Sequence, residues 1–182
     1  GNMTATVGDV SLTAGSTLTT SGVIVSGNQN AGLNAVGDIA TGTVTSGNGS
    51  VNIVSSAAGV GTGTVTAGTS INVSGVTGLG LGALTANAGG ITLASSDPGA
   101  DINLGGPVQA INAGLSANQP GMSVVSGRDI RIHRVGLTTT TSGGINLQAA
   151  RDLNLMVSDG GSNGTPPHNI TAVRAEQRLG AS

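Results

Sequence analysis

One short stretch of the chain recurs twice at a fixed interval of 20 residues, and this period restricts the possible folds more than any other feature. The copies align without gaps, so that Val51, Ile71 and Ile91 share one column. They read "GNGSVNIVS" at 47–55, "AGTSINVSG" at 67–75 and "NAGGITLAS" at 87–95. A period of about 20–30 residues is typical of solenoids, in which each unit is too small to bury its apolar face alone and stacks on its neighbours. The sequence therefore predicts stacked coils with these three side chains pointing inward.

Each repeat contains short strands. Aliphatic and polar residues alternate in "SVNIV" and "GITLA", which is the period of a strand and not of a helix. A second alternating segment precedes the first, and Val60, Leu79 and Leu81 form a third apolar cluster in the gap between repeats. The second segments read "GTVTSG" at 42–47, "GTVTAG" at 63–68 and "GALTAN" at 82–87. Three strands per coil, joined by glycine-rich bends, predict an all-β fold, a parallel β-helix (β-solenoid) of roughly triangular cross-section.

The repeat continues toward the C-terminus with longer spacings. "GMSVVSGRDIRI" at 121–132 lies 23 residues before "GINLQAARDLNL" at 144–155, and the Arg-Asp pair recurs with it. "GITLASSDPGADINL" at 90–104 has the same two strands with three extra residues, which we place in the turn around Pro98. We expect about seven coils of about 20–23 residues with loop insertions, starting near residues 22, 50, 70, 90, 121 and 144. Their first-strand positions are Val23, Val51, Ile71, Ile91, Met122, Ile145 and Ile170.

The composition fits such a stack and excludes several kinds of site. Of 182 residues 33 are Gly, and the chain has no Phe, Tyr, Trp or Cys. Columns of Val, Ile and Leu fill a solenoid without rings, each contributing about 1.5–3 kcal/mol when fully buried. Without Cys there is no disulfide framework and no Cys-based metal site or nucleophile. Without aromatic residues on which bases stack we predict no nucleic-acid partner, and without an apolar run of roughly 20 residues we predict no membrane insertion.

Several of these segments resemble the repeats of a known family. "GGITLAS", "GRDIRIH", "GGINLQAARDLNLMVS" and "GDVSLTAG" are similar to repeats of filamentous haemagglutinin and related two-partner-secreted exoproteins, including the stalks of contact-dependent growth-inhibition toxins. The resemblance covers roughly residues 8–157. It implies a right-handed parallel β-helix that is exported through an outer-membrane transporter, is secreted or held at the bacterial cell surface, and forms an adhesin shaft. The implied partner is a receptor or glycan on a host or neighbouring cell.

The two termini of the chain suggest how it is organised. At the N-terminus "GNMTATVGDVSL" enters the strand alternation at once, whereas "AVRAEQRLGAS" at 172–182 contains good helix formers. We interpret 172–182 as a short helical cap or as the start of a further coil. Complete solenoids carry atypical polar units at their ends, and we therefore expect residues 1–182 to be a single β-helix segment of a longer array.

Charged residues supply the first candidate sites. Arg128 and Asp129 recur one coil later as Arg151 and Asp152, which makes them a possible charged binding stripe. Opposite charges on successive coils also neutralise one another diagonally, and we favour this structural interpretation. The acidic loop "SSDPGAD" at 95–101 could hold calcium, but it lacks the GGxGxD pattern of calcium-binding solenoids, and a polar turn is favoured.

Other chemistry finds less support in the sequence. His133 and His168 are far apart and lack partners at metal-ligand spacing, so both are expected to be solvated. Sugar-cleaving enzymes need converging carboxylates and usually aromatic platforms, whereas this chain has eight acidic residues and no ring. We therefore predict no catalytic residue, no metal and no cofactor, and keep a polysaccharide-degrading β-helix as the weakest alternative.

An ice-binding solenoid is the stronger alternative to the adhesin shaft. Regular ice-binding faces consist of flat columns of threonine at strand spacing. The second-strand segments place threonines outward on either side of the buried aliphatic residues, although the array covers three coils and one column is interrupted at Ala83. This possible surface ladder consists of Thr43, Thr45, Thr64, Thr66 and Thr85.

Overall fold

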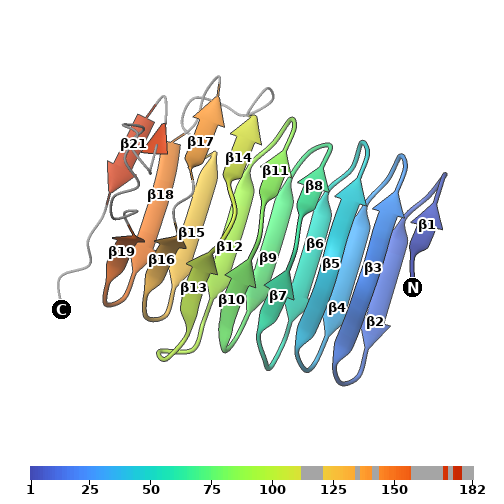
Figure 1. Cartoon of the computed structure of the whole chain (residues 1–182), viewed down its shortest axis with the longest axis horizontal. Helices are drawn as coiled ribbons and strands as arrows, with labels where there is room; N and C mark the ends of the chain where they lie inside the picture. Colours follow the sequence, from blue (N-terminus) through green and yellow to red (C-terminus); the bar gives the residue numbers. More distant parts are fainter. Residues whose placement is uncertain (112–120, 134–135, 141–143, 157–169, 172–173, 178–182) are drawn as a thin grey trace, which may run out of the picture.

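The computed structural model describes residues 1–111, 121–133, 136–140, 144–156, 170–171 and 174–177. In these ranges the chain consists of strands and turns and forms a parallel β-solenoid of about seven turns (Figure 1). The predicted fold class is therefore confirmed. No helix long and apolar enough to cross a membrane occurs within these ranges.

Two parallel sheets make up the coil. In the described ranges sheet B has eight strands in simple sequence order, because about seven turns of the chain separate the first strand from the last. They are β2 (Val10–Ala14), β4 (Ala31–Ala35), β6 (Val51–Ser55), β9 (Ile71–Gly75), β12 (Ile91–Ser95), β15 (Met122–Ser126), β18 (Gly144–Ala149) and β21 (Arg174–Gln177). Each strand is parallel to its neighbours, because the chain returns to sheet B in the same direction after every coil.

Sheet A has thirteen strands and is bent into two segments. The first segment contains β7 (Val60–Thr62), β10 (Gly78–Leu81), β13 (Asp101–Leu104), β16 (Ile130–His133) and β19 (Leu153–Met156). The second contains β1 (Met3–Ala5), β8 (Val65–Ala67), β11 (Leu84–Ala86), β14 (Val108–Ile111), β17 (Leu137–Thr140) and β20 (Ile170–Thr171). The long strands β3 (Leu18–Ser26) and β5 (Ile39–Ser46) run through both segments.

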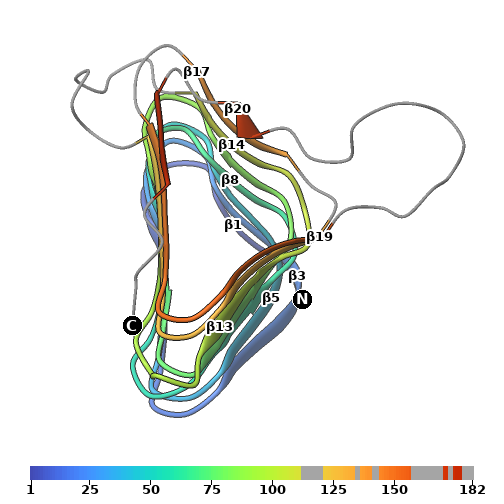
Figure 2. The ribbon, with the colours of Figure 1, turned by 90° about the vertical axis from the view of Figure 1, so that its left-hand side faces the viewer.

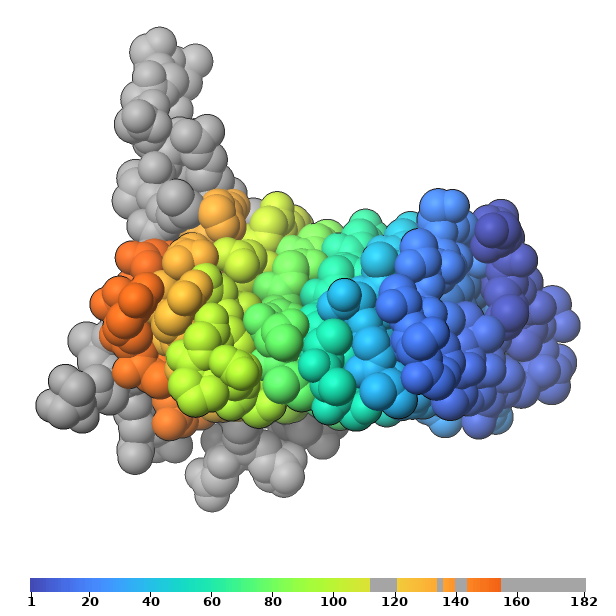
Figure 3. Space-filling model, turned by 90° about the horizontal axis from the view of Figure 1, so that it is seen from below, coloured from blue at the N-terminus to red at the C-terminus, as the bar shows by residue number. Residues whose placement is uncertain are grey.

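The two segments of sheet A and the single sheet B give the coil three sides. Figure 2 looks along the solenoid and shows the triangular outline, and Figure 3 shows successive coils as bands along a rod. Glycines recur at the bend of sheet A because the backbones of neighbouring coils approach closely there. A Cβ atom on Gly82 would lie 2.4 Å from the carbonyl oxygen of Gly63, and one on Gly63 would lie 2.9 Å from that of Gly42.

Aliphatic columns fill the interior. Val51, Ile71 and Ile91 are register partners in sheet B and are at most 1% exposed, which confirms the predicted inward column. Branched side chains suit these positions because they pack well on a pleated surface that is buried on one side. The register also confirms the alignments Val44–Val65–Leu84, Val60–Leu79, Met122–Ile145, Val124–Leu147, Ile130–Leu153 and Ile132–Leu155.

Two of the predicted first-strand positions are wrong. Val23 lies in β3 of sheet A, where it pairs with Thr43 and is 36% exposed. The partner of Val51 in the preceding coil is Ala31, so this coil starts near residue 31 and not near residue 22. Ile170 likewise belongs to sheet A, where it pairs with Leu137. Every coil contains more than one alternating strand, and the alternation alone does not tell them apart.

The insertion around Pro98 is where the sequence predicts it. Five residues, 96–100, separate β12 from β13, whereas two, 76–77, separate β9 from β10 one coil earlier. The three extra residues therefore bulge outward and leave both sheets in register. At the C-terminus residues 174–177 form β21 and extend sheet B, which for these four residues fits the alternative of a further coil and not that of a short helix. The rest of 172–182 lies outside the described ranges.

Candidate functional site

Three aspartates are stacked at one corner of the solenoid, where the chain leaves sheet B and enters sheet A. Asp101, Asp129 and Asp152 occupy equivalent positions on successive coils. Ile102 and Ile130, which follow the first two, are register partners, and the N–H of Ile130 donates to the carbonyl oxygen of Asp152 at 2.9 Å. Like charges at this spacing repel one another, so the stack requires compensating cations.

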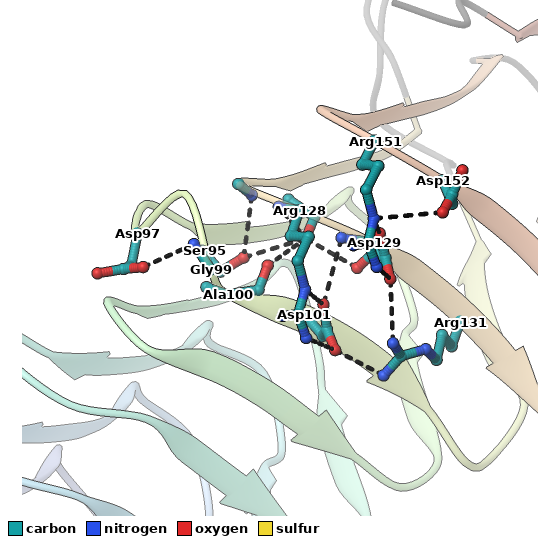
Figure 4. Close-up of polar contacts among 12 residues, drawn as sticks. Ser95, Asp97, Gly99, Ala100, Asp101, Arg128, Asp129, Arg131, Arg151 and Asp152 are labelled. Carbon is teal, nitrogen blue, oxygen red and sulfur yellow. Dashed lines mark hydrogen bonds and ion pairs between the residues drawn. The ribbon is translucent and has the colours of Figure 1, made fainter.

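Arginines from neighbouring coils supply these cations (Figure 4). Arg128 binds Asp101 with two hydrogen bonds, from Nε to Oδ1 at 2.7 Å and from Nη2 to Oδ2 at 2.6 Å. Arg131 bridges two coils, because its Nη1 lies 2.5 Å from Oδ2 of Asp101 and its Nη2 lies 3.0 Å from Oδ2 of Asp129. Paired bonds of this kind match the planar guanidinium to a carboxylate and fix its orientation.

Arg151 repeats the arrangement one coil later. Its Nε donates to Oδ1 of Asp129 at 2.9 Å and its Nη2 donates to Oδ2 at 2.6 Å. The side chain of Asp129 is 1% exposed, whereas those of Arg151 and Asp152 are each 58% exposed. Asp152 lies 3.2 Å from Nε of Arg151. In each Arg-Asp pair the arginine therefore binds the aspartate of the preceding coil.

The ion pairs shift the protonation equilibria of the cluster. The hydrogen bond from Arg128, helped by the charge of Arg131 and opposed by burial, lowers the pKa of Asp101 from 3.8 to about 2. The pKa of Asp129 is lowered chiefly by its hydrogen bond from Arg151. Bonding to these carboxylates raises the pKa values of Arg128 and Arg151. All four groups are therefore charged near neutral pH, and none is poised to transfer a proton.

The sequence identified four members of this cluster and missed two. Arg128, Asp129, Arg151 and Asp152 lie together, with Asp129 buried beneath Arg151 and the predicted diagonal neutralisation as their main interaction. The missed members are Asp101 and Arg131. The available signal was the alignment of "ADINL" with "RDIRI" and "RDLNL", which the three-residue insertion before Asp101 obscures.

The acidic loop does not direct its two carboxylates toward one point. Asp97 accepts the N–H of Gly99 at 2.7 Å within the exposed turn, while Asp101 turns toward the arginines (Figure 4). Among the residues that the structure describes, no three His, Cys, Asp or Glu side chains are arranged to hold a metal ion. His133 is exposed at the end of β16, and His168 lies outside the described ranges.

The possible threonine ladder lies on the second segment of sheet A, away from the charged cluster. Thr45, Thr66 and Thr85 are direct register partners on β5, β8 and β11, which confirms that they form one column. The next positions of that column are Gln109 and Thr138. The second column starts with Thr43, and Thr64 follows in the next coil, where its carbonyl oxygen accepts the N–H of Val44 at 2.9 Å. The Thr45 column is therefore regular over three coils and then interrupted by Gln109, whereas the Thr43 column is interrupted one coil earlier by Ala83.

The chain was also compared with known proteins. It matched no model of a protein family, no curated protein and no solved structure. Its function is therefore inferred from its own residues and geometry.

Proposed function

We propose that the chain is part of the shaft of a large bacterial adhesin of the filamentous haemagglutinin type, secreted by a two-partner route and displayed at the cell surface. In this role the solenoid is a structural and adhesive spacer that holds a distal binding region away from the cell. Its partners are the outer-membrane transporter during export and a receptor or glycan on a host or neighbouring cell. The proposal includes no catalytic activity.

The constant cross-section of the solenoid is the observation that carries this proposal. Ile91 pairs with Ile71 on one side and with Met122 on the other, so sheet B stays in register across the longest coil. Extra residues are accommodated as loops, and each coil adds about 4.8 Å of length. A chain built in this way gains length without a new fold at each step, which is what a shaft needs.

The charged cluster supports a structural role in the same way. It joins three successive coils through Asp101 and Asp129, next to the inserted turn at 96–100. Because the carboxylates are neutralised by arginines of the same chain, the cluster is complete without a ligand. It stabilises the coil that departs most from the 20-residue period.

Surface display tests the proposal directly. A short epitope inserted at Pro98, in the exposed turn, should be detected by antibody on intact cells of the organism that encodes the chain. Deleting the gene of the outer-membrane transporter should abolish this signal, while a periplasmic marker protein stays inside. An epitope that becomes accessible only after the cells are lysed would contradict the proposal.

Ice binding is the second candidate, because Thr45, Thr66 and Thr85 form a regular outward column. Thermal hysteresis of the purified chain decides between the two. A shaft should neither depress the freezing point beyond its colligative effect nor reshape ice crystals. Replacing Thr64 and Thr66 with Tyr should then change stability by no more than about 1 kcal/mol, the span of strand preferences. Hysteresis that disappears in this double variant would establish the ice-binding function.

A further inference from the structure

A groove of about 520 Å³ crosses the first segment of sheet A between Asp38 and Arg128. The groove is shallow and open to solvent. Gly61 and Gly80 line the bottom of the groove, where no side chain covers the backbone. They are register partners on β7 and β10. A Cβ atom on Gly80 would meet nothing within 4 Å, so the backbone does not require glycine there. Mid-strand glycines weaken a sheet and mark bulges, tight bends or the close approach of a ligand or another backbone.

Asp38 occupies the same position in its coil as the aspartates of the charged cluster. It precedes Ile39 at the entry to sheet A, as Asp101 precedes Ile102 and Asp129 precedes Ile130. Asp101 and Asp129 each receive two hydrogen bonds from an arginine of the following coil. The C-terminal coils thus show how a guanidinium fits against this position.

The corresponding arginines are missing from the coil that follows Asp38. Ala58 stands where Arg128 stands three coils later, and Gly61 stands where Arg131 stands. The exposed carboxylate of Asp38 accepts one hydrogen bond, from the N–H of Gly59 to Oδ1 at 2.9 Å. No hydrogen bond or ion pair among the described residues involves its Oδ2, and Asp38 is one of the residues that line the groove.

We infer that the Asp38 groove binds a guanidinium supplied by an arginine side chain of a partner protein. The carboxylate is already oriented by Gly59, and arginine matches it with two parallel N–H groups, which lysine cannot do. Charge favours the same occupant, because Arg128 already pairs with Asp101 in the lining of the groove and leaves Asp38 as the carboxylate without a cation among the described residues. The site goes beyond the proposed shaft and does not depend on it.

Titration of the 182-residue chain with N-acetylarginine methylamide tests the inference. The amide of Gly59 is the reporter, because it donates to Asp38. We expect a weak but saturable shift of its NMR signal, because a single ion pair open to solvent contributes little free energy of binding. N-acetylcitrulline methylamide, which has nearly the same shape without the charge, should bind at least tenfold more weakly. The absence of a saturable shift, or equal binding of both compounds, would overturn the inference.

Three variants locate the site. Asp38→Asn should weaken binding at least tenfold, with the rest of the amide spectrum unchanged. Asp9→Asn is the matched control, because Asp9 is also exposed and accepts a backbone N–H of the next coil, from Asn30 at 2.8 Å, but lies outside the groove. It should bind as the natural chain does. Ala58→Arg should fill the site from within the chain, abolish binding and raise the Tm. Undiminished binding by Asp38→Asn or by Ala58→Arg would contradict the assignment.

Discussion

Asp129 is bound from the following coil by Arg151 through two hydrogen bonds of 2.6 and 2.9 Å, although only 1% of the aspartate side chain is exposed. The arginine reaches this carboxylate from the surface, where 58% of its own side chain remains accessible. A buried carboxylate needs such partners because its desolvation is costly. The pair therefore joins two coils. Among the described residues the other partners of these side chains, Arg131 for Asp129 and Asp152 for Arg151, each make a single contact with them.

Removing this pair should destabilise the solenoid. Asp129→Ala leaves Arg151 without its bidentate partner and Arg131 with one carboxylate instead of two. We expect a fall of several degrees in Tm, measured by circular dichroism. Asp152→Ala is the control, because Asp152 is 58% exposed and exposed pairs contribute little. Equal Tm values for the two variants would show that the buried pair has no special role.

Acid should lower the free energy of unfolding over a defined pH range, because it protonates Asp101. The pKa of Asp101 is about 2 in the folded chain and near its ordinary 3.8 when the chain is unfolded. Between these values the unfolded chain binds more protons, so stability rises with pH in this window. The contribution of Asp101 is complete above about pH 4 and is lost as the pH falls toward 2. Urea denaturation between pH 5 and pH 2 measures it, and the Asp101→Asn variant should lose less stability over that range.

The sequence predicts the parts of this fold that large aliphatic residues mark. Val51, Ile71 and Ile91 were identified because a constant spacing repeats them in one column. Ala31 holds the same position one coil earlier and is 1% exposed, but its small side chain gives little signal in the sequence. Val23 is larger and gives the stronger sequence signal, although it is 36% exposed and belongs to sheet A.

The charged cluster was predictable only in part for a different reason. Arg128 and Asp129 recur as Arg151 and Asp152 at the coil spacing, so the repeat itself indicates that they are close. The bond between Asp101 and Arg128 spans 27 residues and includes an insertion. No fixed period indicates such a pair. The pair can form because the extra residues loop out between β12 and β13. That placement is known only from the folded chain.

A buried hydroxyl without a partner offers a stabilising substitution. Oγ1 of Thr41 is buried and makes no hydrogen bond, and the residue is 8% exposed. An unsatisfied polar group of this kind costs about 1–3 kcal/mol. Thr41→Val keeps the branched shape and should therefore raise the free energy of unfolding by about 1 kcal/mol. Thr45→Val, on the outer face of the same strand, should change it by less than about 0.5 kcal/mol. A destabilised Thr41→Val variant would mean that the hydroxyl has a bound partner.

Deleting one complete coil should leave a folded and shorter solenoid. Removal of residues 51–70 places Ile71 directly after Ser50, and Ile71 is the register partner of Val51. Sheet A should also close without a gap, because β10 pairs with β7 and β7 pairs with β5 at equivalent positions. The variant should keep the far-ultraviolet circular dichroism of parallel strands and unfold in one transition. Its length should fall by about 4.8 Å, which small-angle scattering can measure.

Deletion of half a coil is the matched control for this prediction. Removing residues 51–60 eliminates β6 and the start of β7, so the chain cannot complete the triangle and Ser50 would enter sheet A directly. This variant loses fewer residues than the first but breaks the columns, because the side of the coil that belongs to sheet B is missing. We expect it to be unfolded or aggregated. If the 51–70 deletion is as disordered as the 51–60 deletion, each coil depends on more than its nearest neighbours, and the solenoid is not an array of interchangeable units.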